Sequence, residues 1–154
     1  SDILVTNIKY NEKNQLLVLT DSSALVIDNK ETRSIIEKFD SSSSFASIEN
    51  ENDVVVINKV ENGLFDISYA VNIYSSKDNS INVNTYPLKA LPSVVSVGQK
   101  YIALLLDNEL VIINTNGRLI KHNAISGNVN EIKFFGNGNM LALVYRDKIE
   151  ILKI

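Results

Sequence analysis

Short apolar runs separated by polar residues follow one another along the whole chain. The runs hold about four to eight residues and are rich in Val, Ile, Leu, Tyr and Phe, which is typical of β-strands. Asn and Ser gather between the runs, where their side chains hydrogen-bond to the backbone and favour turns. Residues 31–39 also have a helical spacing at Ile35, Ile36 and Phe39, but this segment is short and lies where the pattern requires a strand. The pattern therefore predicts an all-β protein.

The runs are organised as an internal repeat. Residues 103–113 align without a gap with residues 142–152, and both read as a strand, a polar turn and a second strand. Residues 18–28 have the same pattern with one extra residue in the turn. Another strand is predicted before each of these hairpins, and a fourth strand after two of them. A unit of four strands in about 36–50 residues has the period of a β-propeller blade.

Four such units cover the chain, and we expect them at residues 1–40, 41–90, 91–127 and 128–154. The second unit is the longest, and its hairpin loop at residues 61–63 ends in a glycine suited to a positive φ angle. The last unit lacks a fourth strand. The predicted fold is therefore a β-propeller fragment, or a small propeller of about four blades, each a four-stranded antiparallel sheet. We expect a single propeller-type domain that belongs to a longer protein.

The second strands of the units are nearly continuous apolar runs, for example at residues 102–106 and 141–144. A sheet with one face in water would instead alternate apolar and polar residues. Continuous runs indicate sheets that are covered on both faces, as blades are by their neighbours. A β-sandwich is the alternative architecture.

The hairpin repeats carry a resemblance to known propellers. Residues 114–117 form an Asn-Thr-Asn-Gly turn before an outer strand at residues 118–121, and this resembles the repeats of WD40-like and quinoprotein-like propellers. The chain departs from WD40 repeats because it has no Trp and no Gly-His dipeptide. It is also similar to uncharacterised bacterial membrane-anchored propeller-like proteins from low-GC Gram-positive organisms. That similarity implies the fold and an extracytoplasmic location, and it implies no activity.

Composition excludes several classes of function. The net charge is −3 and no long basic run occurs, so nucleic acid is not an expected partner. The absence of Cys excludes disulfides and thiolate metal sites. No apolar run approaches the roughly 18 residues that a spanning helix needs, so we expect no direct membrane insertion of this segment.

The sequence offers no convincing catalytic, metal-binding or cofactor-binding residue. His122 is the only histidine and lies on a predicted outer strand, where a surface role is expected. Asp21, Asp107 and Asp147 recur at hairpin turns, where a carboxylate caps the backbone, and they match no calcium loop. The glycine pair at residues 136–138 leads into a strand, whereas a phosphate loop precedes a helix. We predict a protein that is not an enzyme and needs no cofactor.

One aromatic group is a candidate partner surface. Phe65, Tyr69, Tyr74 and Tyr86 lie in the second unit around its long hairpin, and tyrosine is favoured at binding hot spots. Packing within the core is the alternative for these side chains.

The favoured function is a protein-binding scaffold, with self-association through an exposed blade edge as a second mode of contact. One alternative is a propeller that binds a ligand or carbohydrate in a central channel. Its lining would come from the polar residues of the first strands, which are Asn7, Lys9, Ser47, Glu49, Ser93, Ser96, Asn130, Glu131 and Lys133. A structural segment of an envelope or coat protein is the other alternative.

Overall fold

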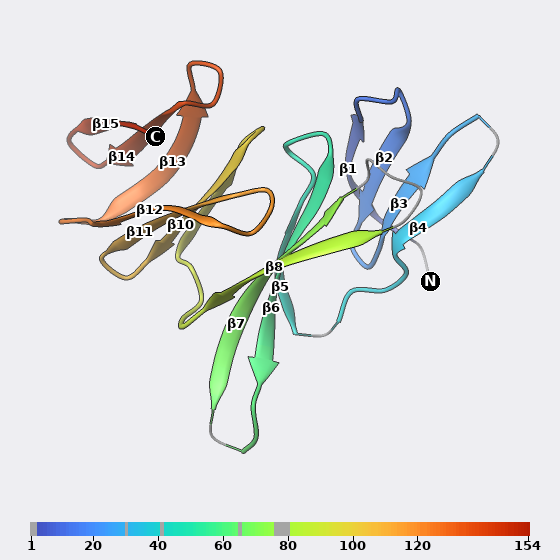
Figure 1. Cartoon of the computed structure of the whole chain (residues 1–154), viewed down its shortest axis with the longest axis horizontal. Coiled ribbons are helices and arrows are strands. Elements are labelled where there is room, and N and C mark those ends of the chain that lie inside the picture. The colour runs from blue at the N-terminus through green and yellow to red at the C-terminus, as the bar shows by residue number, and fades with distance from the viewer. Residues whose placement is uncertain (1–2, 30, 41, 65, 76–80) are drawn as a thin grey trace. The chain divides into compact units, whose positions relative to one another are not determined.

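The computed structural model describes residues 3–29, 31–40, 42–64, 66–75 and 81–154. Over this part of the chain every regular element is a β-strand, which confirms the predicted all-β class (Figure 1). Residues 32–36 form strand β4 (Thr32–Ile36), so the helical spacing in this segment does not produce a helix. The chain divides into two compact units, Ser1–Leu88 and Lys89–Ile154. The expectation of a single domain stays a prediction.

The first unit holds two antiparallel sheets in which the strands lie side by side in chain order. The first sheet consists of β1 (Val5–Tyr10), β2 (Leu16–Thr20), β3 (Ala24–Ile27) and β4. The second sheet consists of β5 (Ser43–Ser47), β6 (Asp53–Glu61), β7 (Ile67–Ser75) and β8 (Asn82–Leu88). This four-strand meander is the topology of a propeller blade.

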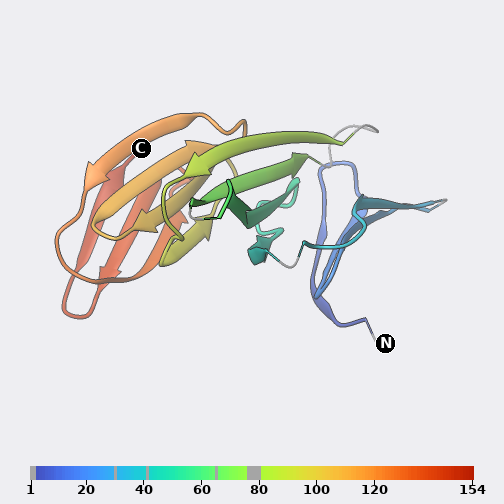
Figure 2. The same cartoon turned by 90° about the horizontal axis from the view of Figure 1, so that it is seen from below.

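The second unit repeats this arrangement with one strand fewer. The third sheet consists of β9 (Val94–Val97), β10 (Tyr101–Leu106), β11 (Glu109–Asn114) and β12 (Leu119–Ala124). The fourth sheet consists of β13 (Val129–Phe135), β14 (Met140–Tyr145) and β15 (Ile149–Lys153). Figure 2 shows these two sheets stacked face to face. No strand pairs with the outer side of β15 among the described residues.

Each unit has its own hydrophobic core between its two sheets. The core of the first unit, which we call the first-unit core, contains side chains of both sheets. Its buried members are Leu17, Leu19, Ala24, Val26, Ile35, Ile48, Val54 and Val56. Val55 and Ile57 point to the opposite face of β6 and are also fully buried. The central strands are therefore covered on both faces, as their continuous apolar sequence predicts.

The second-unit core lies between the third and fourth sheets and includes Leu110, Ile112 and Leu143. The two sheets are in close contact at Gly98, in the turn between β9 and β10. A Cβ atom on Gly98 would lie 2.8 Å from the Cδ2 atom of Phe134 on β13, closer than a real Cβ contact allows. Glycine is required here because the Phe134 ring occupies the space of a side chain.

Buried asparagines shape two equivalent turns of the first unit. Asn11 follows β1, and its Oδ1 accepts hydrogen bonds from the backbone N–H groups of Lys13 and Gln15. Asn50 follows β5, and its Oδ1 accepts from Asn52 and Asp53 in the same way. The amide side chain replaces water for backbone groups that the turn leaves unpaired, which explains a fully buried polar residue at Asn50.

Candidate functional site

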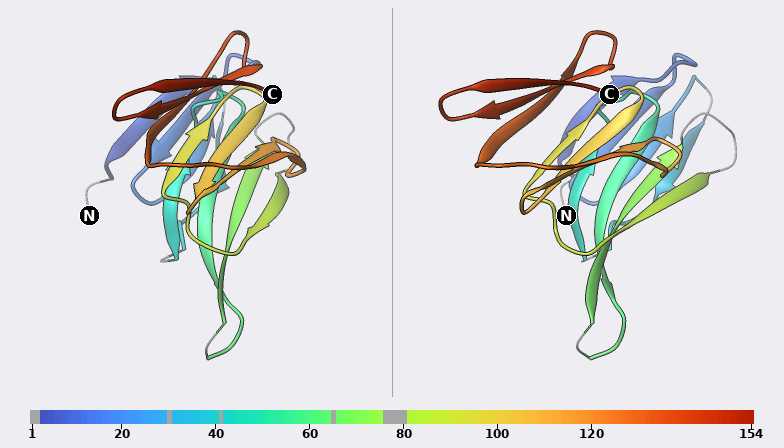
Figure 3. Two further views of the ribbon diagram at one scale, coloured as in Figure 1. Left: turned by 90° about the vertical axis from the view of Figure 1, so that its left-hand side faces the viewer. Right: turned by 60° about the vertical axis from the view of Figure 1, so that its left-hand side comes forward.

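The second sheet carries a hairpin that extends beyond its neighbouring strands. β6 and β7 have nine residues each, whereas β5 has five and β8 has seven. The pairing of β5 stops at Asn58 and that of β8 stops at Tyr69, so the end of the hairpin pairs only with itself. This end projects from the sheet (Figures 1 and 3). Gly63 has a φ of 99° in its loop, as the sequence predicts.

The projecting end exposes apolar side chains. Leu64 lies in the loop and is 93% exposed, and Ile67 at the start of β7 is 52% exposed. Lys59 and Glu61 form an ion pair beside them, with the Lys59 Nζ and the Glu61 Oε1 2.7 Å apart. This hydrogen bond and the carboxylate charge raise the pKa of Lys59. An exposed apolar tip with a charged pair at its side is suited to contact with another protein.

The four aromatic residues of the predicted partner surface do not form one patch. Tyr69 lies two residues before Val71 on β7, and Tyr86 lies opposite Val71 on β8, so both tyrosines share one face of the sheet. Tyr74 points to the other face, where it packs against the first-unit core. Phe65 lies outside the described residues. The partner surface stays a prediction, and only Tyr69 and Tyr86 occur together on one face.

Tyr74 also lines a cavity of about 460 Å³, which we call the Tyr74 cavity. One wall is the connection from β4 to β5, and the other is the face of β6 and β7. The walls include Ile36, Phe39, Asp40, Asn58, Asn72 and Tyr74. Burial raises the pKa of Tyr74. Among the described residues, no side chain or backbone group hydrogen-bonds to the Tyr74 hydroxyl.

A row of hydrogen-bonded side chains, the amide ladder, crosses the same face. The Nδ2 of Asn58 donates to the Oγ of Ser43 at 2.9 Å, and the Nδ2 of Asn72 donates to the Oδ1 of Asn58 at 3.1 Å. The Oγ1 of Thr85 then donates to the Oδ1 of Asn72 at 2.8 Å. Each of the four strands supplies one member. The sequence gives no direct sign of this row, because its members are far apart in the chain.

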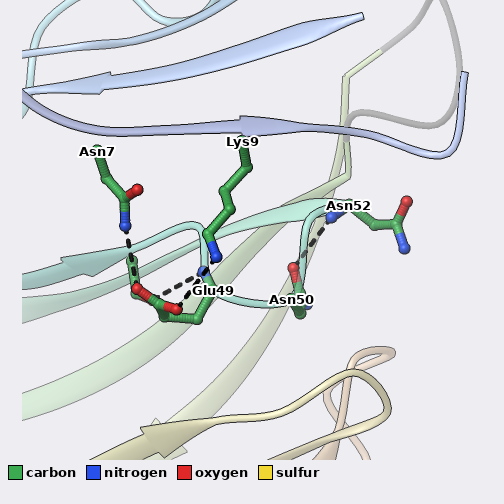
Figure 4. Close-up of polar contacts among 6 residues, drawn as sticks. Asn7, Lys9, Glu49, Asn50 and Asn52 are labelled. Atoms are coloured by element: carbon green, nitrogen blue, oxygen red, sulfur yellow. Dashed lines mark hydrogen bonds and ion pairs between the residues drawn. The ribbon is translucent and has the colours of Figure 1, made fainter. Parts of the chain in front are cut away.

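Three of the polar residues predicted to line a channel, Asn7, Lys9 and Glu49, come together in a second cluster, as Figure 4 shows. The Nδ2 of Asn7 donates to the Oε1 of Glu49 at 3.0 Å, and the Nζ of Lys9 lies 3.7 Å from the Oε2 of the same carboxylate. The Nδ2 of Asn52 donates to the Oε1 of Glu12 at 3.1 Å. These contacts join β1 and its turn to the segment after β5, so we interpret the cluster as a tie between the first two sheets.

The remaining candidates lie at surface positions. The Nε2 of His122 on β12 is 3.0 Å from the Oε2 of Glu109 on β11, and both side chains are about half exposed. Asp107 adopts a positive φ of 49° in the turn between β10 and β11, consistent with its predicted turn role. Over the described ranges, no group of three His, Cys, Asp or Glu side chains is placed to hold a metal ion. The described residues also contain no helix with the length and apolarity needed to cross a membrane.

Comparisons with known proteins agree with this architecture. A family model described as a family of unknown function (DUF5711) matches residues 1–154. No curated protein matches the sequence. Among solved structures, the N-terminal domain of Nup159 is similar with a TM-score of 0.57 at 14% identity, over 98% of this chain and 45% of that one. Hsv2 of Kluyveromyces lactis is similar with a TM-score of 0.52 at 12% identity, over 99% of this chain and 60% of that one.

Both neighbours are propellers, and at these identities the likeness concerns the fold. The chain spans about half the length of each of them. Together with the four meander sheets, this shows that the chain has the fold of a propeller fragment.

Proposed function

The chain belongs to the DUF5711 family, and we propose that it is a non-enzymatic interaction module that binds a protein partner through the projecting end of the β6–β7 hairpin. The observation that carries this proposal is the exposure of Leu64, at 93%, on a hairpin end with which no neighbouring strand pairs in the described part of the chain. Exposed apolar side chains cost free energy in water, and a binding role explains why one is held at a loop tip.

The rest of the hairpin end supports the same role. Ile67 extends the apolar contact along β7, and the Lys59–Glu61 pair supplies a polar rim beside it. Interfaces commonly have an apolar centre with a polar rim. Val55, Val56 and Ile57 of β6 are buried at the base of the hairpin, and they hold the loop in a fixed place at little entropic cost.

Two further expectations belong to this proposal. We expect the propeller fold to serve as a scaffold rather than to catalyse a reaction. The membrane anchoring implied by the similarity to bacterial propeller-like proteins stays a prediction, and it would place the hairpin on an anchored protein.

Site-specific photo-crosslinking tests the proposal directly. A photoreactive amino acid replaces Leu64 in the protein expressed in its own host, and we expect one discrete crosslinked protein. Asn116 provides the matched control because it is exposed in the turn between β11 and β12. Adding Ile67→Lys to the Leu64 probe should remove the crosslink. Equal products from positions 64 and 116, or a product insensitive to Ile67→Lys, would contradict partner binding at the hairpin.

A further inference from the structure

The Tyr74 cavity is a second feature, and it shares only the Lys59–Glu61 pair with the partner site proposed at the hairpin end. Asn58, Asn72 and Tyr74 of its lining lie on the face of the second sheet opposite Tyr69 and Tyr86. Its volume of about 460 Å³ falls within the range of small-molecule sites in proteins, roughly 300–1,000 Å³. The cavity lies entirely within the first unit.

The amide ladder supplies the polar wall of this cavity. Asn58 and Asn72 each use one N–H and one oxygen lone pair within the ladder. A carboxamide has two N–H donors and two lone pairs, so each residue keeps a donor and an acceptor for a further partner. The ladder holds both amides in fixed orientations, which lowers the entropy cost of binding.

Two aromatic rings complete the site. Tyr74 offers a ring and a hydroxyl that has no hydrogen-bond partner among the described residues, and Phe39 lines the opposite wall. An aromatic ring gives a ligand a flat apolar contact, while the phenol can donate and accept at its edge. The combination fits a ligand with apolar faces and a polar rim.

The charges in the walls favour a neutral ligand. Two bases, Lys38 and Lys59, and two acids, Asp40 and Glu61, line the cavity, so their formal charges cancel. Lys59 and Glu61 also neutralise each other directly at 2.7 Å. A phosphate would meet two carboxylates, and a cation would meet two ammonium groups. A purely apolar ligand would leave the amide wall without hydrogen bonds, which is costly when water is excluded.

From these observations we propose that the Tyr74 cavity binds a neutral saccharide. Vicinal hydroxyl groups both donate and accept, as do the carboxamides of Asn58 and Asn72 and the hydroxyl of Tyr74. The C–H face of a sugar ring packs on the aromatic side chains. The proposal does not require partner binding at the hairpin tip, although the two sites share the Lys59–Glu61 pair.

The experiment is an NMR titration of the ¹⁵N-labelled protein with maltose and with cellobiose. We expect at least one disaccharide to shift the side-chain amide signals of Asn58 and Asn72 at concentrations up to about 20 mM, a range that detects dissociation constants near 1 mM. Glucose 6-phosphate and a short Gly-Ser peptide serve as comparators. Absence of these shifts with both disaccharides, or larger shifts with either comparator, would overturn the proposal.

Matched variants locate the binding. Tyr74→Phe keeps the ring and removes the hydroxyl, and it should weaken binding by about three- to tenfold, the value of one hydrogen bond. Asn72→Ala removes the centre of the ladder and should abolish binding. Asn82→Ala, on the opposite face of β8, should leave it unchanged. If Asn72→Ala does not fold, Tyr74→Phe still tests the location of the site. Unchanged affinity in Tyr74→Phe would show that the ligand binds elsewhere.

Discussion

The third and fourth sheets contain the same hairpin in two different surroundings. Residues 103–113 and 142–152 align without a gap, which pairs Leu110 with Ile149 and Ile112 with Ile151. Leu110 and Ile112 are fully buried on β11, while Ile149 and Ile151 on β15 are 64% and 50% exposed. The difference arises because Leu110 and Ile112 belong to the core between the third and fourth sheets, whereas Ile149 and Ile151 lie on the other face of the fourth sheet, opposite Val144 and Ala142. Similar strand sequences therefore contribute differently to the free energy of unfolding, depending on whether another sheet covers them.

The largest contrast is expected from truncating the paired isoleucines. Ile112→Ala should destabilise the protein by about 2–5 kcal/mol, because it leaves a cavity in the second-unit core. Ile151→Ala should cost less than about 1 kcal/mol, since its side chain is half in water already. Denaturant unfolding followed by circular dichroism measures both. Equal losses of stability would show that β15 is covered in solution.

The contact between the third and fourth sheets at Gly98 gives the next largest expected effect on stability. Gly98→Val places a branched side chain where the Phe134 ring lies, and we expect a loss of about 1–3 kcal/mol in the free energy of unfolding. Adding Phe134→Ala should recover part of that loss by making room. Thermal unfolding of the two single variants and the double variant measures this coupling. Strictly additive losses of stability would argue against contact between the two residues.

The open side of β15 is expected to drive self-association. Ile149→Lys with Ile151→Lys should weaken association by about tenfold, because charges on an edge strand oppose pairing with another chain. Leu119→Lys with Ile120→Lys on β12 is the matched control, since those residues are exposed to a similar degree and belong to a complete sheet. Sedimentation velocity over a concentration series reports the mass. A monomer at every concentration would remove β15 as a contact surface.

The smallest expected effect on stability is that of Glu150 on β15. In the repeat, Glu150 aligns with Val111 of β11, which is buried. Hydrogen bonds from Lys148 and then from Tyr145 lower the pKa of Glu150 below its usual value of 4.5. Because the folded-state pKa is the lower one, Glu150 stabilises the fold above pH 4.5, and this contribution disappears as the pH falls through the lowered pKa. Glu150→Gln should flatten the pH dependence of the melting temperature between about pH 5 and 3. An unchanged slope would mean that the contact is absent in solution.

The sequence alone is sufficient to predict the repeat and the fold class, because hydrophobic spacing and turn residues are local signals. The long hairpin and the positive φ at Gly63 follow from the same signals. These signals do not predict which face of its sheet each side chain occupies. A β-bulge interrupts the pairing of β1 with β2, of β5 with β6 and of β13 with β14, and each bulge moves the following residues to the other face.

The candidate site was harder to predict for the same reason. Tyr69, Tyr74 and Tyr86 are close in sequence, but one odd and one even position on β7 point in opposite directions. The amide ladder depends on the pairing of four strands at once, so no single segment contains its signal. Glu49 meets Asn7 and Lys9 only after the first two sheets stack.

The amide ladder has a consequence for how the long hairpin finds its alignment. Sliding β7 along β6 by two residues would keep every apolar side chain on its correct face, so hydrophobic patterning alone does not forbid the misaligned form. In one direction that shift would place Asn72 opposite Val54, inside the first-unit core and away from Asn58. Stranding a carboxamide in hydrocarbon is costly. The ladder therefore selects against this offset pairing of the long hairpin.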